Sequence, residues 1–263
     1  MFRKILIANR GEIAVRIIRA ARELGIDTVA VYSTADKEAL HTLLADEAVC
    51  IGPAKSTDSY LNMNAVLSAA VLTGAEAIHP GFGFLSENSK FATMCEEVGI
   101  KFIGPSGAVM DMMGDKINAR AQMIKAKVPV IPGSDGEVHT SEEALEVAEK
   151  IGYPVMLKAS AGGGGKGIRK VEKAEDLVAA FESASSEAKA AFGNGAMYME
   201  RVIYPARHIE VQILADQQGH VVHLGERDCS LQRNNQKVLE ESPSVAIGKT
   251  LRQQIGEAAV RAA

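Results

Sequence analysis

The sequence has no tryptophan, and aromatic residues make up only 5% of its 263 residues. This leaves little material for the stacking platforms that bind single-stranded nucleic acids. The net charge of −4 also lacks the basic excess typical of proteins that bind nucleic acids or anionic membranes. We therefore expect neither a nucleic acid nor a membrane among the partners of this protein.

Cysteine is scarce as well. The three cysteines, Cys50, Cys95 and Cys229, are odd in number and far apart, without a C-x-x-C pair. This usage is typical of buried free thiols in a reducing compartment, with a redox or metal role as the alternative. No apolar run approaches the length of a membrane span, and the start "MFRKILIANRGE" has too short an apolar stretch for a signal peptide. We expect a cytoplasmic protein.

The first part of the chain alternates between strand and helix patterns. "KILIAN" predicts a buried strand, and the following apolar residues recur at helical spacing from Ile13 to Leu24. Further strands, "IDTVAVYS", "AEAIHPG" and "IKFIGPS", predict a parallel sheet covered on both faces. Residues 1–114 are therefore expected to form a Rossmann-like α/β domain. Only Gly11 follows the first strand, which excludes the three-glycine dinucleotide fingerprint there.

From residue 115 the pattern changes. A capped helix "TSEEALEVAEKIG", a strand "YPVMLKAS", a glycine loop, a returning strand "GIRKV", a long helix and a strand "AMYMERVI" follow in order. They predict a partly antiparallel lobe over about residues 129–203. In residues 204–263, "HIEVQILADQQGHVVHLGERDCSLQ" alternates with period two and predicts a hairpin. The remaining pattern is an amphipathic helix without a stop signal.

The loop in "KASAGGGGKGIR" is the most unusual feature. A run of glycines costs backbone entropy, which favours a loop that a ligand such as phosphate must approach closely. A Walker A loop is excluded because Gly167, without a hydroxyl, follows Lys166. Gly162, Gly164 and Gly167 match the dinucleotide fingerprint by letter, but a strand follows where that fingerprint needs a helix. A kinase flap lacks its H-R-D and D-F-G partners, and a surface hairpin without ligand is the remaining alternative.

Seven motifs together resemble a known family: "ANRGEIAVRIIRAARELG", "AIHPGFGFLSEN", "FIGPS", "MGDK", "KASAGGGGKGIR", "RHIEVQILAD" and "ERDCSLQR". The chain resembles biotin carboxylase of the ATP-grasp superfamily, as a subunit of acetyl-CoA carboxylase or as a domain of a related biotin-dependent carboxylase. The resemblance covers essentially the whole chain, as the N-terminal part of a longer protein. It implies an α/β fold in which a Rossmann-like preATP-grasp domain, residues 1–114, precedes an incomplete ATP-grasp domain, residues 115–263. The lobe over 129–203 would be the ATP lid, and 204–263 a truncated C-terminal lobe.

The resemblance implies ATP-dependent carboxylation of biotin, carried on biotin carboxyl carrier protein, with bicarbonate and through carboxyphosphate. This is the first half-reaction of acetyl-CoA carboxylase in fatty acid synthesis. A carboxyltransferase partner and a homodimer of the full-length protein are implied too. The ligands of Mg²⁺ are expected beyond residue 263, so we assign no metal ligand here and expect this chain to be inactive alone. Another ATP-grasp ligase, such as carbamoyl-phosphate synthase or a carboxylating purine-pathway enzyme, and a non-catalytic nucleotide-binding fragment are the alternatives.

The resemblance assigns Lys116, Lys158, Gly164 and Gly165 to the ATP phosphates. By itself, Lys116 is typical of a solvated lysine at a helix end. Lys158, in contrast, lies in an otherwise apolar strand and already calls for a charged partner. Lys166 is compatible with a solvated charge. We expect the lid from Gly162 to Gly167 to be poorly ordered without nucleotide.

The remaining assignments concern the base and the reacting groups. By resemblance, the backbone from Glu200 to Ile203, which includes Arg201 and Val202, reads the adenine, and His208 and Asn235 lie near the nucleotide. Gln232 lies near the site of phosphoryl transfer, and Lys237 contacts bicarbonate, for which a cation is a suitable partner. For His208 alone, a structural role is the alternative.

Two residues depart from the pattern of well-studied bacterial members. Asn235 stands where those members have a nucleotide-contacting histidine, and asparagine keeps one hydrogen-bond donor. Phe82 stands where some members have tyrosine, which removes one hydroxyl near the biotin pocket.

Overall fold

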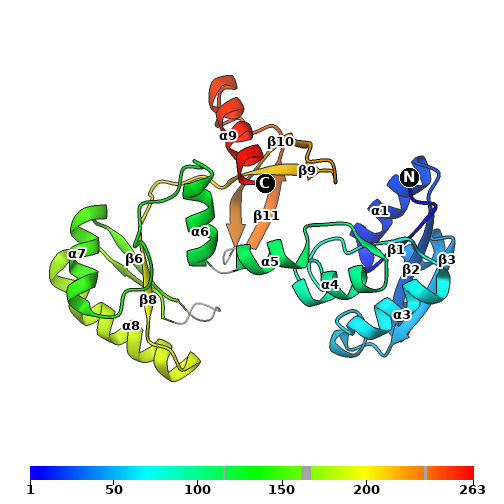
Figure 1. Cartoon of the computed structure of the whole chain (residues 1–263), viewed down its shortest axis with the longest axis horizontal. Helices are drawn as coiled ribbons and strands as arrows, with labels where there is room; N and C mark the ends of the chain where they lie inside the picture. The colour runs from blue at the N-terminus through cyan, green and yellow to red at the C-terminus, as the bar shows by residue number, and fades with distance from the viewer. Residues whose placement is uncertain (115, 161–166, 234–235) are drawn as a thin grey trace. The chain divides into compact units, whose positions relative to one another are not determined.

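The structure is a computed structural model that describes residues 1–114, 116–160, 167–233 and 236–263, with the side chain of Lys116 outside the described part. The chain divides into two compact units, Met1–Gly114 and Asp115–Ala263. Figure 1 shows an α/β fold in both, with helices packed on sheets. The predicted fold class is confirmed.

Unit 1 is built on a five-stranded parallel sheet in the order β3-β2-β1-β4-β5. Its strands are β1 (Lys4–Ile7), β2 (Asp27–Ser33), β3 (Glu47–Gly52), β4 (Ala77–His79) and β5 (Lys101–Phe102). Four of them follow the predicted apolar runs. No strand was predicted at β3, an edge strand whose short apolar run, Ala48–Ile51, is only partly buried, with Ile51 its one buried residue.

Helices cover both faces of this sheet: α1 (Gly11–Glu23), α2 (Leu40–Leu44), α3 (Met63–Thr73), α4 (Ser89–Glu97) and α5 (Gly107–Gly114). Successive side chains of a strand point to opposite faces, so β1 supplies two cores. Ile5 and Ile7 pack with α1, whereas Leu6 packs with α3 and α4. Burial on both faces explains why the strands read as continuous apolar runs.

The strand order reverses between β1 and β4, where open parallel sheets bind ligands beyond the carboxyl ends of the strands. Asn9, directly after β1, is 3% exposed and joins the two loops there. Its Nδ2 donates to the carbonyl oxygens of Pro80 and Phe82, each at 2.8 Å. These bonds fix the backbone of Phe82, whose side chain is 61% exposed.

Gly52, at the end of β3, is expected to be intolerant of any side chain. Its φ is +144°, and a Cβ there would lie 2.3 Å from the backbone oxygen of Asp58. Backbone strain and overpacking together predict that Gly52→Ala lowers the free energy of unfolding by about 3 kcal/mol. Denaturant unfolding measures this. Gly114→Ala is the control, because a Cβ there meets nothing within 4 Å; equal stability of the two variants would contradict the prediction.

Two buried histidines predict that unit 1 loses stability in mild acid. Burial lowers the pKa of His41 and of His79 below the ordinary 6.5. At His41, Asp36 opposes this shift and Arg10 adds to it. The unfolded chain then binds more protons than the folded one below about pH 6.5, so stability is complete above that pH and falls as the pH decreases through the lowered pKa values.

The measurement is denaturant unfolding between pH 7.5 and 5.5. His41 Nε2 lies 3.2 Å from the carbonyl oxygen of Val31. His41→Gln keeps a donor for that oxygen but no longer titrates, so we expect a shallower decline than in the unaltered chain. A stability that does not change over this pH range would contradict the prediction.

Unit 2 begins with a lobe around the sheet β7-β6-β8, called here the β6 sheet, in which both pairings are antiparallel. Its elements are α6 (Lys116–Lys125), α7 (Ser141–Ile151), β6 (Val155–Ala159), β7 (Arg169–Val171), α8 (Leu177–Phe192) and β8 (Met197–Arg201). The predicted cap is present, because the hydroxyl oxygen of Thr140 accepts from the amide of Glu143 at 3.2 Å. One apolar core joins α7, α8 and the sheet.

The rest of unit 2 is the sheet β11-β10-β9, called here the β10 sheet, with one helix packed on it. Its elements are β9 (Ile209–Ala215), β10 (Val221–Arg233), β11 (Gln236–Glu241) and α9 (Lys249–Ala262). The predicted hairpin is confirmed, with Ala215 opposite Val221. The sequence analysis did not predict β11, whose six residues are all exposed.

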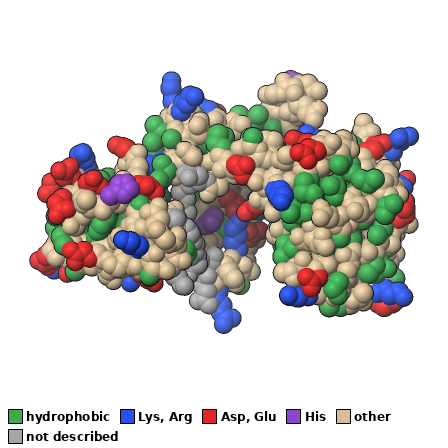
Figure 2. Space-filling model, turned by 60° about the horizontal axis from the view of Figure 1, so that its bottom comes forward, with side chains coloured by type: hydrophobic (Ala, Val, Ile, Leu, Met, Phe, Trp, Pro, Cys, Tyr) green, Lys and Arg blue, Asp and Glu red, His purple; other side chains and the backbone are tan. Residues whose placement is uncertain are grey.

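The surface charges and two of the three cysteines are as the sequence predicted. On the face shown in Figure 2, acidic and basic side chains lie interspersed among the described residues. Within that part of the chain, no helix has the length and apolar character needed to cross a membrane. All three cysteines are free, and Cys95 and Cys229 are buried. The prediction of a buried thiol is wrong for Cys50, because it lies on the exposed edge strand β3.

Candidate functional site

Lys158 of β6 has the charged partner that its place in an apolar strand calls for. Its Nζ forms a hydrogen-bonded ion pair with the Glu200 carboxylate of the neighbouring strand β8. The side chains are 29% and 21% exposed, so the pair is largely removed from water but still reachable by a ligand. An ammonium held on a sheet in this way is preorganised to meet an anion.

The segment that leaves β8 has two of its amides already engaged. The amide of Arg201 donates to the carbonyl oxygen of Pro132, and that of Val202 to the carbonyl oxygen of Pro154, each at 2.8 Å. Among the described residues, no acceptor faces the amide of Ile203, whose side chain is 50% exposed. Within the predicted segment Glu200 to Ile203, the amide of Ile203 is therefore a donor that is available to a ligand.

A second group of charges lies on the β10 sheet and centres on Glu210 of β9. The carboxylate accepts from Arg227 Nε of β10 at 2.6 Å and from Lys237 Nζ of β11. Burial opposes ionisation of Glu210, but the bonds from Lys237 and Arg227 outweigh it and lower its pKa. The same bond to Glu210 raises the pKa of Lys237. Lys237 is thus a fixed cation, 39% exposed.

His208 and Gln232 lie beside this group and contact each other. Gln232 Nε2 lies 2.9 Å from His208 Nδ1 and donates to the carbonyl oxygen of Cys229 at 3.0 Å. His208 Nε2 is 3.7 Å from Glu210 Oε2. His208 and Gln232 also line an open groove of about 470 Å³ together with Arg207 and Ser230. His208 and Gln232, which lie 24 residues apart in the chain, thus line the same groove, which is large enough for a ligand.

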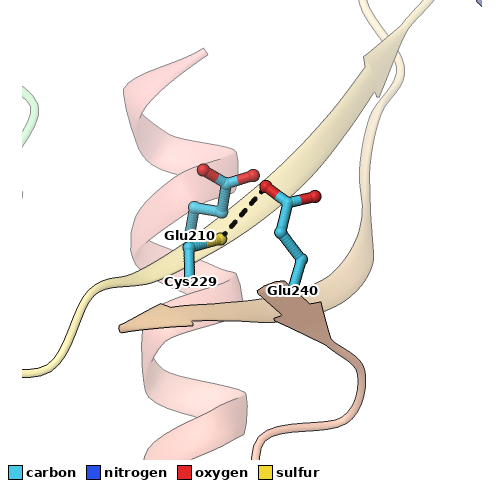
Figure 3. Close-up of side chains that lie close together, drawn as sticks. All are labelled: Glu210, Cys229 and Glu240. Carbon is cyan, nitrogen blue, oxygen red and sulfur yellow. Dashed lines mark hydrogen bonds between the residues drawn. The ribbon is translucent and has the colours of Figure 1, made fainter. Parts of the chain in front are cut away.

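Figure 3 shows Glu210 and Glu240 with the buried thiol of Cys229, whose Sγ is 3.5 Å from Glu240 Oε1. The ligand atoms of the three side chains lie within 4.8 Å of one another, as in a metal site. Lys237, however, bonds to Glu210 and approaches Glu240 to 3.6 Å. Because Lys237 and Arg227 already balance the two carboxylates, the cluster lacks the excess negative charge that holds a divalent cation.

Several predicted site residues lie outside the described part of the chain. They are the side chain of Lys116, the glycines Gly164 and Gly165, and Asn235. Most of the predicted lid, Gly162 to Gly167, lies there too, so the expected poor order of that loop stays a prediction. Sequence reasoning missed Glu210 and Arg227 as site residues. The period-two alternation of the hairpin could have indicated them, because it places Glu210 and Gln212 on one face of the strand. Arg227 lies on that face too, and Gln212 accepts from its guanidinium at 3.2 Å.

Comparisons with known proteins identify the family of the chain. Residues 1–110 match the family model "Biotin carboxylase, N-terminal domain", and residues 115–263 match "Carbamoyl-phosphate synthase L chain, ATP binding domain". The chain is 58% identical to Biotin carboxylase 1 of Bacillus subtilis, over 100% of this chain and 58% of the relative. It is 54% identical to a pyruvate carboxylase subunit of Methanothermobacter thermautotrophicus, over 100% of this chain and 54% of the relative.

Solved structures give the same result. The Campylobacter jejuni biotin carboxylase–β-γ-ATP complex is 52% identical, with a TM-score of 0.87 over 100% of this chain and 59% of that one. The biotin carboxylase domain of a thermophilic 2-oxoglutarate carboxylase bound to bicarbonate is 49% identical, with a TM-score of 0.91 over 100% of this chain and 57% of that one. The chain thus spans less than two thirds of the length of these relatives.

The chain has a parallel α/β unit followed by an antiparallel lobe that carries a lysine–glutamate pair. Together with the match to an ATP-binding domain, these features define a protein of the ATP-grasp class. Within that class, the chain belongs to the biotin carboxylase family.

Proposed function

We propose that the full-length protein carboxylates biotin on a biotin carboxyl carrier protein, with ATP and bicarbonate and through carboxyphosphate. The observation that carries this proposal is the Lys237 ammonium, fixed by Glu210 beside Gln232 and His208. Relatives with this fold are described in complex with β-γ-ATP, with ADP and with bicarbonate. A fixed cation is the group that both bicarbonate and a transferring phosphoryl group require.

Lys158 and Lys116, with the amides of Gly164 and Gly165, would contact the phosphates. Until the nucleotide binds, Glu200 holds the Lys158 ammonium in a fixed orientation. Because the amides of Arg201 and Val202 donate within the protein, the amide of Ile203 would donate to the purine ring. This narrows the adenine contact to one amide of the predicted segment.

The reacting groups would meet at the β10 sheet. Lys237 would bind bicarbonate, while Gln232 and His208 orient the transferring phosphoryl group and Asn235 contacts the nucleotide. The pKa of Lys237 is raised by Glu210, which keeps the ammonium charged through the reaction. A cation that is already in place stabilises the developing negative charge without reorganisation.

Mg²⁺ is implied by the family, but the described carboxylates near these lysines do not fit it. Glu200, Glu210 and Glu240 each have a lysine or arginine partner within 4 Å. We propose that the ligands of Mg²⁺ lie beyond residue 263, and we expect that this chain alone does not turn over.

Relatives of similar identity are named for different carboxylases. The pyruvate carboxylase subunit is 54% identical and a 2-oxoglutarate carboxylase domain 52% identical, as against 58% for Biotin carboxylase 1. We propose that this protein is part of an acetyl-CoA carboxylase, so that the carboxyl group is used in fatty acid synthesis in the cytoplasm. A carboxyltransferase would accept it from the carrier, and the full-length protein would form a homodimer.

The test is ADP release by the full-length protein with bicarbonate, with and without biotin. We expect release to depend on bicarbonate and to rise with biotin. Carbamoyl-phosphate synthase is the second candidate, because the ATP-binding domain matches a family model with that name. Release that ammonia stimulates and biotin does not would overturn our proposal in its favour. ATP binding without any bicarbonate-dependent ADP release would instead indicate a non-catalytic nucleotide-binding protein.

A further inference from the structure

Arg120 ties the helix that begins at Lys116 to the β6 sheet. It lies four residues after Lys116, about one helical turn along α6. Its Nη1 donates to the carbonyl oxygen of Ile131, in the crossover that leads to α7. Its guanidinium also lies close enough to Tyr198 in β8 to lower the pKa of that hydroxyl. Pro132, the residue after Ile131, accepts from the amide of Arg201 in β8, so the bond to Ile131 links α6 to that strand.

Tyr198 belongs to the same face of the β6 sheet as the candidate phosphate-binding pair. It lies directly opposite Lys158 in the register of β6 and β8, and Glu200 follows two residues later. Tyr198 is only 7% exposed. Burial raises the pKa of its hydroxyl, and the nearby Glu200 raises it further against the effect of Arg120. The hydroxyl therefore stays neutral, on the face of the sheet that carries Lys158 and Glu200.

The close approach at Tyr198 depends on a glycine. A Cβ at Gly133 would lie 2.8 Å from the Tyr198 hydroxyl oxygen and 2.7 Å from the backbone oxygen of Met199. Arg120 Nε is also fully enclosed without an acceptor among the described residues. An enclosed donor without a partner has a cost, which a solvated surface arginine avoids. Arg120 keeps its bond to the carbonyl oxygen of Ile131 although one of its donors is enclosed in this way.

We propose that Arg120 is a positioning residue for the phosphate end of the nucleotide. It fixes the first turn of α6, which carries Lys116, against the strand pair that carries Lys158 and Glu200. The two lysines assigned to the phosphates are otherwise on separate segments, and only a fixed spacing lets both meet one polyphosphate. This inference rests on the proposed function, because it assumes that ATP binds at these lysines.

The experiment compares the affinities of ATP and AMP for the unaltered chain and for Arg120→Met, measured by titration calorimetry. AMP lacks the terminal phosphates but keeps the base, which would contact the amide of Ile203, a residue to which Arg120 makes no hydrogen bond. We expect Arg120→Met to weaken ATP binding about tenfold and AMP binding less than twofold. Arg169→Met is the matched control, since Arg169 lies on the same sheet in an exposed ion pair with Glu187.

Tyr198→Phe supplies a second test. It removes the hydroxyl but keeps the ring, and we expect a smaller loss that disappears in the Arg120→Met background, because both changes remove the same electrostatic interaction between Arg120 and Tyr198. Equal weakening of ATP and AMP, or unchanged affinity with lower thermal stability, would overturn the inference and leave Arg120 a structural residue. If the unaltered chain binds AMP but gains nothing from the terminal phosphates of ATP, the proposed function fails at these lysines, and the inference with it.

Discussion

Replacing Lys158 by glutamine is expected to weaken ATP binding by about 100-fold, because a largely buried ammonium is lost from the phosphate site. Lys158 is held by Glu200, and glutamine leaves that carboxylate without its cation. The site then changes from a paired charge to a net negative one, which repels the polyphosphate. Titration calorimetry of ATP into each variant measures the effect.

Lys170→Gln is the matched control for this experiment. Lys170 lies on β7 of the same sheet, opposite Met156, and forms an exposed ion pair with Glu172 at 2.7 Å. Exposed pairs contribute little, so its loss should leave ATP affinity within about twofold. Glu200→Gln added to Lys158→Gln should restore part of the affinity, since the repulsion is removed. ATP affinity that is unchanged in Lys158→Gln would refute the phosphate assignment.

Replacing Glu210 by glutamine is expected to lower bicarbonate-dependent ADP release by the full-length protein about 100-fold. Glu210 is the common partner of Lys237 and Arg227, so its loss frees the cation assigned to bicarbonate. Without this carboxylate the pKa of Lys237 also falls, because the bond to Glu210 is what raises it most. ATP binding at Lys158 is a separate contact, so the ATP affinity should change less than threefold.

Glu240 provides the comparison for Glu210. It is also a glutamate beside Lys237, but its nearest oxygen is 3.6 Å from Nζ and its side chain is 42% exposed. Glu240→Gln should therefore change ADP release by less than about threefold. Initial rates at varied bicarbonate separate binding from turnover in both variants. Equal effects of the two substitutions would show that ADP release depends on negative charge near Lys237 in general and not on the specific contact with Glu210.

Local patterns in the sequence were enough for most of the secondary structure. The apolar runs of β1, β2 and β4 are continuous because both faces of the sheet are covered. The alternation from residue 209 predicted the β9–β10 hairpin, and Thr140 with its acidic first turn predicted the start of α7. In each case the pattern lies within the residues of the helix or strand itself, so the element could be predicted without knowledge of its distant contacts.

The elements and residues that were missed depend on distant contacts. The edge strand β11 is exposed throughout and β3 in three of its six residues, and both are held by pairing with one neighbouring strand. Cys50 is exposed because it lies on the edge strand β3. Arg120 lies 78 residues before Tyr198 in the numbering, and nothing local in "NARAQ" indicates that its guanidinium acts on that hydroxyl.

The sequence by itself determined the family and the α/β class, because long motifs and hydrophobic periodicity are local properties of the chain. It also singled out Lys158 as a charge that needs a partner. Only the tertiary structure showed that this partner is Glu200 and that the amide of Ile203 is available after β8. It also showed that Glu210 bonds to both Lys237 and Arg227. These are pairings between strands, and strand register follows from the packing of the whole sheet, which no single segment specifies.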